Sequence, residues 1–107
     1  FKMCIILIMN IKVKNITNAN GNKVANQFEI IGDKFTIFQS YNSTIAIVKQ
    51  EEWRNKVYLD EWAWDYSRTT LKHLYNFLGQ WGFDLNKKKV LKLIERGEFI
   101  LTDLNEE

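Results

Sequence analysis

The sequence predicts an α+β domain, in which an antiparallel meander of about four to five strands is followed by two helices packed on one face. Up to Trp64, apolar residues alternate with polar ones, as they do in strands; beyond it they recur every three or four residues, as they do in helices. Strands that all precede the helices favour an antiparallel sheet, because a parallel sheet requires strands and helices that alternate.

Length and composition allow one small domain with an aromatic core. The chain has 107 residues, of which 46% are hydrophobic and 14% aromatic, enough for one domain and not two. Its formal net charge of +2 is too small to indicate nucleic-acid binding by itself. One cysteine and one histidine exclude a disulfide framework and a zinc site of Cys and His ligands. We expect no metal, no cofactor and an intracellular setting.

The first residues contain an apolar run, from Met3 to Met9, that is too short to cross a membrane. Lys2 precedes this run, as a cation does in a signal peptide, but no small-residue cleavage site follows. We expect Met9 to be the natural start, with 1–8 a translated upstream extension and 9–107 a single domain. The alternative is that the apolar run forms a buried edge strand.

Alternating apolar residues predict the strands. We expect them at 10–16, 27–31, 34–39, 44–49 and 56–60. A segment rich in Asn and Gly, 17–22, separates the first two, and 24–26 leads into the second. Gly32 and Asp33 suit a type I′ or II′ hairpin turn between the second and third strands. A further turn is expected at 40–43.

The first predicted helix spans 68–78. Its apolar stripe follows the i, i+3, i+4, i+7 spacing of an amphipathic helix and consists of Leu71, Leu74, Tyr75 and Leu78. Ser67 is a good N-cap. Gly79 or Gly82 is expected to end the helix, because glycine tolerates the left-handed conformation at a helix C-terminus.

The second predicted helix spans 85–96, with an apolar stripe that begins at Val90. Asp84 is expected to cap its start. Gly97 occupies the position after the helix end where a left-handed residue belongs. The segment 98–104 is either a short added strand or an extended tail that packs on the sheet.

The start of the first helix is a candidate anion site. A helix N-terminus carries unpaired N–H groups and the positive end of the helix dipole, and hydroxyls and cations surround it here. The residues expected to bind a phosphate or a partner's carboxylate are Ser67, Arg68, Thr69, Thr70, Lys72 and His73. The alternative is a simple helix cap, with the two cations paired to Asp65 or Glu61 and the imidazole at the core edge.

A basic patch opens the second predicted helix, at Lys87, Lys88 and Lys89. Lysines at a helix N-terminus interact unfavourably with the positive end of the helix dipole. Their presence there indicates a functional role. They would contact phosphate, while the aromatic rings of Trp81 and Phe83 nearby would stack on bases. The alternative is a solvated helical turn.

Exposed aromatic residues are the candidates for a protein interface. The chain has four tryptophans, which cannot all be central in so small a fold. The interface candidates are Tyr41, Trp62, Trp64 and Trp81. The alternative is that these tryptophans form a partly buried lid over the end of the sheet.

Catalysis is not expected. Ser67 and His73 are six positions apart on one helix, so they lie on different sides of it, whereas a nucleophile needs a base within reach. The carboxylates of Asp60, Glu61 and Asp65 lack the spacing of a metal-binding loop. We therefore expect a protein that is not an enzyme.

Four motifs occur in order along the chain: NGNKVANQF at 20–28, FQSYNSTIA at 38–46, WDYSRTT at 64–70 and GEFILTDL at 97–104. Together they resemble a family of small single-domain proteins of unknown function that is common in bacteriophages and mobile elements. The resemblance covers about 10–105. It implies a phage or mobile-element origin, a cytoplasmic location in the host cell, and Met9 as the start, but it implies no catalytic residues.

Two hypotheses follow. In the first, the chain is a small accessory protein that binds a protein partner without catalysis and modulates a host function such as defence. In the second, it binds nucleic acid through 67–72 and the lysines at 87–89, and its binding falls steeply as salt rises. Neither hypothesis involves a membrane.

Overall fold

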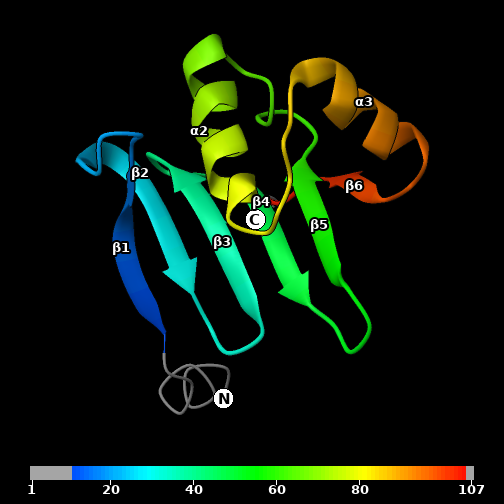
Figure 1. Ribbon diagram of the computed structural model, residues 1–107, viewed down its shortest axis with the longest axis horizontal. Coiled ribbons are helices and arrows are strands. Elements are labelled where there is room, and N and C mark those ends of the chain that lie inside the picture. Colours follow the sequence, from blue (N-terminus) through cyan, green and yellow to red (C-terminus); the bar gives the residue numbers. More distant parts are fainter. Residues whose placement is uncertain (1–10, 106–107) are drawn as a thin grey trace.

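Six strands in chain order form one sheet in the computed structural model, which describes residues 11–105 (Figure 1). The elements are β1 (Lys12–Thr17), β2 (Lys23–Ile31), β3 (Phe35–Ser40), β4 (Ser43–Gln50), β5 (Asn55–Asp60), α2 (Arg68–Gly79), α3 (Lys87–Glu95) and β6 (Phe99–Thr102). Neighbouring strands are antiparallel except β5 and β6, which are parallel. The α+β class is confirmed. The expectations about Met9, about 1–8 and about an N-terminal edge strand lie outside the described residues.

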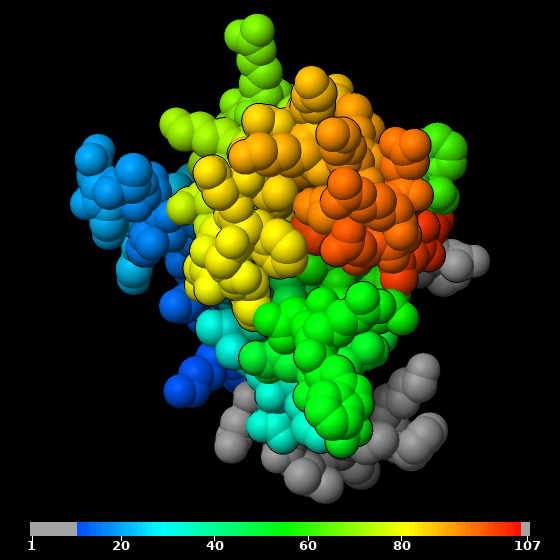
Figure 2. Space-filling model, turned by 45° about the vertical axis from the view of Figure 1, so that its right-hand side comes forward, coloured from blue at the N-terminus to red at the C-terminus, as the bar shows by residue number. Residues whose placement is uncertain are grey.

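The core lies between the helices and the central strands (Figure 1). Alternate strand residues and the apolar helix stripes supply it, because each strand buries one face and each helix one stripe. Its fully buried members include Phe38, Val48, Val57, Leu59, Leu74, Phe77, Leu78 and Val90. The rings of Phe38 and Phe77 lie 5.5 Å apart and join α2 to β3. Figure 2 shows α3 (orange) and the segment before it (yellow) closing this side of the molecule.

Strand β2 is longer than predicted, and its first residues pair irregularly with the neighbouring strands. The strand was expected at 27–31, but it begins at Lys23. Neither neighbouring strand places a residue directly opposite Val24, Ala25 or Asn26, and Asn26 has a left-handed backbone with φ of 62°. The alternation of apolar residues stops where the pairing becomes irregular. The sequence pattern therefore predicted that 24–26 only precede the strand, whereas they are part of it.

The turn at Gly32 differs from the predicted type. A type I′ or II′ turn needs positive φ at its first central residue, and neither Gly32 nor Asp33 has it. Instead the N–H of Gly32 donates to the carbonyl of Phe35 at 2.9 Å. A Cβ at Gly32 would lie 2.3 Å from the Phe35 ring, so the close approach of that ring is what requires a glycine.

The two helix starts compare differently with the predictions. Ser67 caps α2 as expected, with its Oγ accepting from the N–H of Thr70 at 3.1 Å. The predicted cap of α3 is wrong. Asn86 takes that role, accepting from the N–H of Lys89 at 2.9 Å, because Leu85 packs partly buried against the core and delays the helix. Asp84 instead lies 4.0 Å from the Lys89 ammonium.

The C-terminal elements follow the pattern closely. Gly97 has a left-handed φ of 77° after α3, as predicted. Of the two alternatives for 98–104, the added strand is the one that forms, as β6. It pairs with β5 in parallel, with Phe99 opposite Val57.

Candidate binding groove at the start of helix α2

A pocket of about 440 Å³ separates the start of α2 from β2 and from the turn between β3 and β4. Its lining residues are Val24, Ala25, Gln27, Ser40, Tyr41, Tyr66, Ser67, Thr69, Thr70 and His73. A second pocket of about 240 Å³ shares four of these residues and adds Ser43, Ile45 and Ala63. We call the two pockets together the tyrosine groove.

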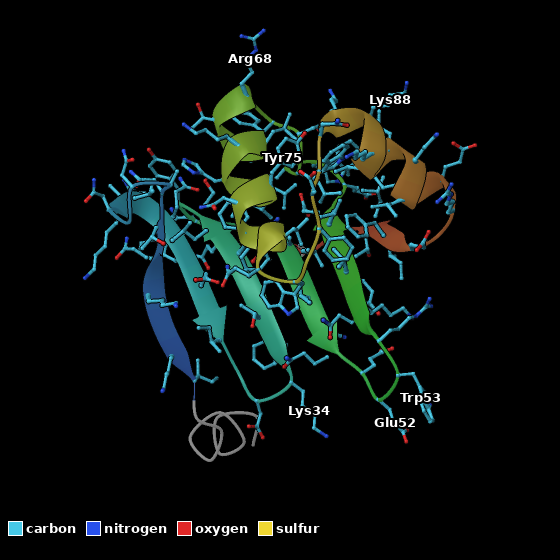
Figure 3. The ribbon with its side chains drawn as sticks, in the orientation of Figure 1. Lys34, Glu52, Trp53, Arg68, Tyr75 and Lys88 are labelled. Carbon is cyan, nitrogen blue, oxygen red and sulfur yellow. The ribbon has the colours of Figure 1, made fainter. Side chains whose placement is uncertain are left out.

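The tyrosine groove contains only part of the predicted anion site. Ser67, Thr69, Thr70 and His73 line it, but neither predicted cation does. Arg68 extends outward from the start of α2 (Figure 3), and Lys72 is exposed. The structure therefore brings the hydroxyls and the imidazole together without a cation among the lining residues.

Two exposed tyrosines stand at the groove. Tyr41 is 64% exposed and Tyr66 is 83% exposed, and both line both pockets. Tyr41 was a predicted interface residue, whereas Tyr66 was missed as a site residue. The available signal was its place in the WDYSRTT motif, directly before the cap residue.

The turn that carries Tyr41 is fixed on both sides. The N–H of Tyr41 donates to the carbonyl of Asn26 at 2.7 Å, and the carbonyl of Tyr41 accepts from Gln39 Nε2 at 2.8 Å. Tyr41 has a φ of 53°, a conformation that costs a residue other than glycine roughly 1 kcal/mol or more. These contacts hold the tyrosine in place against that cost.

The hydroxyl of Ser67 is occupied by its role as a cap. Its Oγ lies 3.0 Å from the Thr70 hydroxyl as well as 3.1 Å from the Thr70 N–H.

The carboxylate of Asp60, one of those considered as a metal ligand, is likewise occupied by hydrogen bonds within the protein. Buried, it accepts from the N–H groups of Trp62 at 3.2 Å, Ala63 at 2.9 Å and Leu104 at 2.8 Å. The Asp60 carboxylate thus supports the turn before Tyr66.

His73, which lines the groove, favours its neutral form. Burial, and then the charge of Lys72, lowers the pKa of His73 below its ordinary value of 6.5, so its imidazole is neutral at pH 7. On the same helix, burial and then the charge of Asp65 raise the pKa of Tyr75 above its ordinary value of 10.0. The lining is therefore uncharged and rich in hydroxyls.

Gln27 is a groove residue that no motif or pattern in the sequence singled out as a candidate. Its side chain is 5% exposed and lines the larger pocket. Its Oε1 has no hydrogen-bond partner among the described residues. Its position on the same strand face as Glu29, opposite that of Phe28 and Ile30, was the only hint.

The tryptophans predicted as interface residues do not lie on one common surface. Trp62 is 76% exposed and directly precedes Ala63 of the groove. Trp64 is 4% exposed and belongs to the core, so the prediction of a surface contact there is wrong. Trp81 is partly buried, with its ring 5.1 Å from that of Phe77. Trp53, at 90% exposure, lies in the turn between β4 and β5, far from α2 in the view of Figure 3.

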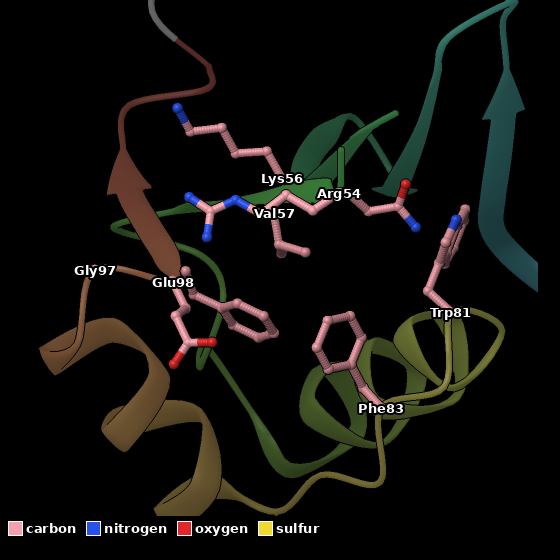
Figure 4. Close-up of a pocket in the computed structure, with 9 residues that line it drawn as sticks. Arg54, Lys56, Val57, Trp81, Phe83, Gly97 and Glu98 are labelled. Atoms are coloured by element: carbon pink, nitrogen blue, oxygen red, sulfur yellow. The ribbon is translucent and has the colours of Figure 1, made fainter. Parts of the chain in front are cut away.

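Phe83, one of the aromatic residues expected to stack on bases, lines a pocket of about 280 Å³ with Lys89 of the predicted basic patch and with Lys92 and Arg96. Lys87 lies 3.7 Å from the Asp65 carboxylate, and Lys88 projects from the start of α3 (Figure 3). Trp81 and Phe83 also line a separate pocket of about 280 Å³ with Arg54 (Figure 4). The ring of Phe83 packs edge-on to Phe99 at 5.2 Å, so it serves the core.

Comparison with known proteins adds a family but no activity. A model of the family of unknown function DUF8033 matches residues 11–95. No curated protein matches the chain, and no solved structure does. Among the described residues, none of the helices is both long enough and apolar enough to cross a membrane.

Proposed function

The chain belongs to the family of unknown function DUF8033, and we propose that it is a non-catalytic module that binds a protein partner through the tyrosine groove. One observation carries the proposal. Two exposed tyrosines, Tyr41 and Tyr66, stand at pockets lined by hydroxyl groups and by no charged side chain.

Tyrosine and small hydroxyl residues are well suited to protein recognition. A tyrosine offers a large, rigid contact surface at low cost in conformational entropy, and serine and threonine supply adaptable hydrogen bonds. Trp62 lies beside Ala63 of the groove and adds a third exposed aromatic ring. Tryptophan and tyrosine are the residues on which binding energy most often concentrates.

The motifs behind the resemblance support the same location. NGNKVANQF contributes Val24, Ala25 and Gln27 to the groove, and FQSYNSTIA and WDYSRTT contribute its two tyrosines. Segments far apart in the chain thus meet at one surface. We propose on this resemblance that the protein is a phage or mobile-element accessory protein, cytoplasmic in its host, that modulates a host function such as defence.

The geometry of Ser67 supports a function without catalysis. A serine nucleophile requires a base that accepts its proton, but the Ser67 oxygen lies within hydrogen-bond distance of the Thr70 hydroxyl and accepts from the Thr70 N–H. An activated serine would have to give up the cap of α2.

Nucleic-acid binding is the second candidate, favoured by one observation. Arg68 and Lys88 project from the starts of α2 and α3 at the same end of the molecule (Figure 3). Cations and helix N-termini at one end suit a phosphate backbone. Against this, Asp65 and Asp84 lie 3.7 Å from Lys87 and 4.0 Å from Lys89, respectively, and reduce the local positive charge.

The test is capture of partners from a bacterial lysate by the tagged chain, with and without nuclease. Tyr66→Ala and Trp62→Ala should each reduce recovery of a nuclease-resistant protein about tenfold or more, the effect of removing a major contact residue. Trp53→Ala is the matched control, because Trp53 is also a highly exposed aromatic residue but lies far from the groove, and its loss should change nothing. All three variants should unfold at the wild-type temperature.

Two results would count against the proposal. Capture that survives Tyr66→Ala and Trp62→Ala would separate binding from the groove. Recovery of nucleic acid, with proteins lost after nuclease treatment and binding that falls steeply with salt, would favour the second candidate and direct substitution to Arg68 and Lys88.

A further inference from the structure

We propose that the tyrosine groove recognises a peptide amide of its partner, and that Gln27 is the residue that binds it. The inference rests on the proposed function and deepens it by naming the chemical group that is bound. It is carried by a buried side-chain oxygen that lacks a partner in the pocket beside α2.

Gln27 differs in this respect from its neighbour on the same strand face. The carboxylate of Glu29 is bound by Gln80 Nε2 at 2.7 Å and lies 3.7 Å from the Lys14 ammonium. The Oε1 of Gln27 is equally buried but has no partner among the described residues. An unmet buried acceptor is unfavourable in the free protein, and a ligand that donates to it removes that penalty.

The start of α2, which lines the same pocket, offers N–H donors. The N–H of Thr70 is bound by Ser67 Oγ, but the N–H groups of Arg68 and Thr69 open the helix and have no acceptor within it. Thr69 lines the same pocket as Gln27. A group that binds both Gln27 Oε1 and these N–H groups must therefore both donate and accept.

An amide meets this requirement with its N–H and its C=O. A phosphate or carboxylate offers acceptors alone and would face the Gln27 oxygen unfavourably, whereas an ammonium offers donors alone and is opposed by the dipole of α2. Gln27 itself carries a donor beside its acceptor, so its side chain can pair with both the C=O and the N–H of an amide. The neutral imidazole of His73 adds no charge that would favour an ion.

The start of β2, where its pairing with β1 and β3 is interrupted, favours the amide of a peptide main chain. Val24 and Ala25 line the pocket, and neither neighbouring strand places a residue directly opposite them. The Val24 carbonyl already accepts from Asn15 Nδ2 at 3.0 Å, so an extended peptide would pair through its own backbone groups with Ala25. A sugar also donates and accepts through its hydroxyls, but it cannot continue a strand.

The test is an NMR titration of the full chain, isotope-labelled on nitrogen, with three probes. These are N-acetyl-glycylglycine N-methylamide, inorganic phosphate and glucose. Gln27→Met keeps the length of the side chain and removes its amide. Gln50→Met, at the exposed end of β4, is the matched control.

The peptide probe should shift the side-chain amide signals of Gln27 and the backbone signals of Thr69 and Ala25 in a saturable way. Its affinity should fall about threefold to tenfold in Gln27→Met, the effect of losing one or two neutral hydrogen bonds, and should be unchanged in Gln50→Met. The unfolding temperature of Gln27→Met should equal or exceed that of the wild type, because the substitution removes an unmet acceptor.

Three results would overturn the inference: no saturable shift of the Gln27 side chain by the peptide in the wild-type protein, saturation by phosphate or glucose instead, or equal peptide affinity in Gln27→Met. The first two need only the wild-type protein, so they hold even where the variant does not fold. If partner capture survives Gln27→Met but not Tyr66→Ala, the inference fails and the proposed function stands. If capture survives Tyr66→Ala while the peptide probe binds, the reverse holds.

Discussion

Asp60 links the sheet to the segment that carries Tyr66. Its buried carboxylate accepts from three backbone N–H groups, two in the turn after β5 and one at Leu104. Charged hydrogen bonds of this kind each contribute more than neutral ones. One side chain thus ties the turn to the chain beyond β6.

Asp60→Ala should lower the free energy of unfolding by about 3 kcal/mol or more, because it leaves buried donors without an acceptor. Asp60→Asn should lose less, since it keeps one acceptor oxygen. Glu61→Ala, at the exposed neighbouring position, is the control and should stay within about 0.5 kcal/mol of the wild type. Urea denaturation measures all three, and a loss at Asp60 no larger than that at Glu61 would contradict the structural role.

At the scale of the helices, each start depends on one side chain. Ser67→Ala and Asn86→Ala should each destabilise the domain by about 1 kcal/mol, the usual loss for an N-cap. Ser67→Asp should retain stability, because aspartate also caps and its charge suits the helix dipole. Asp84→Ala tests the corrected assignment of the α3 cap: a loss equal to that of Asn86→Ala, measured by the same denaturation, would restore Asp84 as the cap.

The sequence predicted the helices well because their packing is one-sided. Leu71, Leu74 and Leu78 recur at the period of the surface they bury, and Ser67 is an unambiguous cap. The start of α3 was misplaced because Asp84 and Asn86 are equally good cap residues. The choice between them rests on how Leu85 packs on the core, and this is a tertiary contact that no local pattern contains.

At the scale of the whole molecule, the groove was only half predictable. The start of α2 was recognised from its hydroxyls, but Gln27 was not, because Gln27, like Glu29 on the same strand face, is a polar residue at a buried position. They are buried beneath the helix layer, whereas Phe28 and Ile30 on the other face are only partly buried. The irregular pairing at Asn26 and the left-handed Tyr41 shape the groove through contacts between distant segments.

The stability of the whole domain should depend on pH through His73. Its pKa is lowered in the folded state, by burial and then by Lys72, so the unfolded state binds a proton more readily. The contribution of His73 to the free energy of unfolding is therefore fully present at pH values above 6.5, the ordinary pKa of histidine. This contribution declines as the pH falls below that value.

Urea denaturation at about pH 7.5 and about pH 5.5 measures this effect. His73→Gln should lose less stability between the two conditions than the wild type does, because glutamine does not titrate. An identical loss in the two proteins would assign the pH dependence to other groups.

The parallel pairing of β5 with β6 has a kinetic consequence. Every other strand pair in the described sheet joins neighbours along the chain, so a short turn closes each one. β6 must wait until the chain from Glu61 to Glu98 has looped back with both helices, and the entropy of closing so long a loop slows that step. The sheet should therefore assemble from β1 to β5 and be completed at its last edge after the rate-limiting barrier. Contacts made by β6 would then govern how fast the domain unfolds, and not how fast it folds.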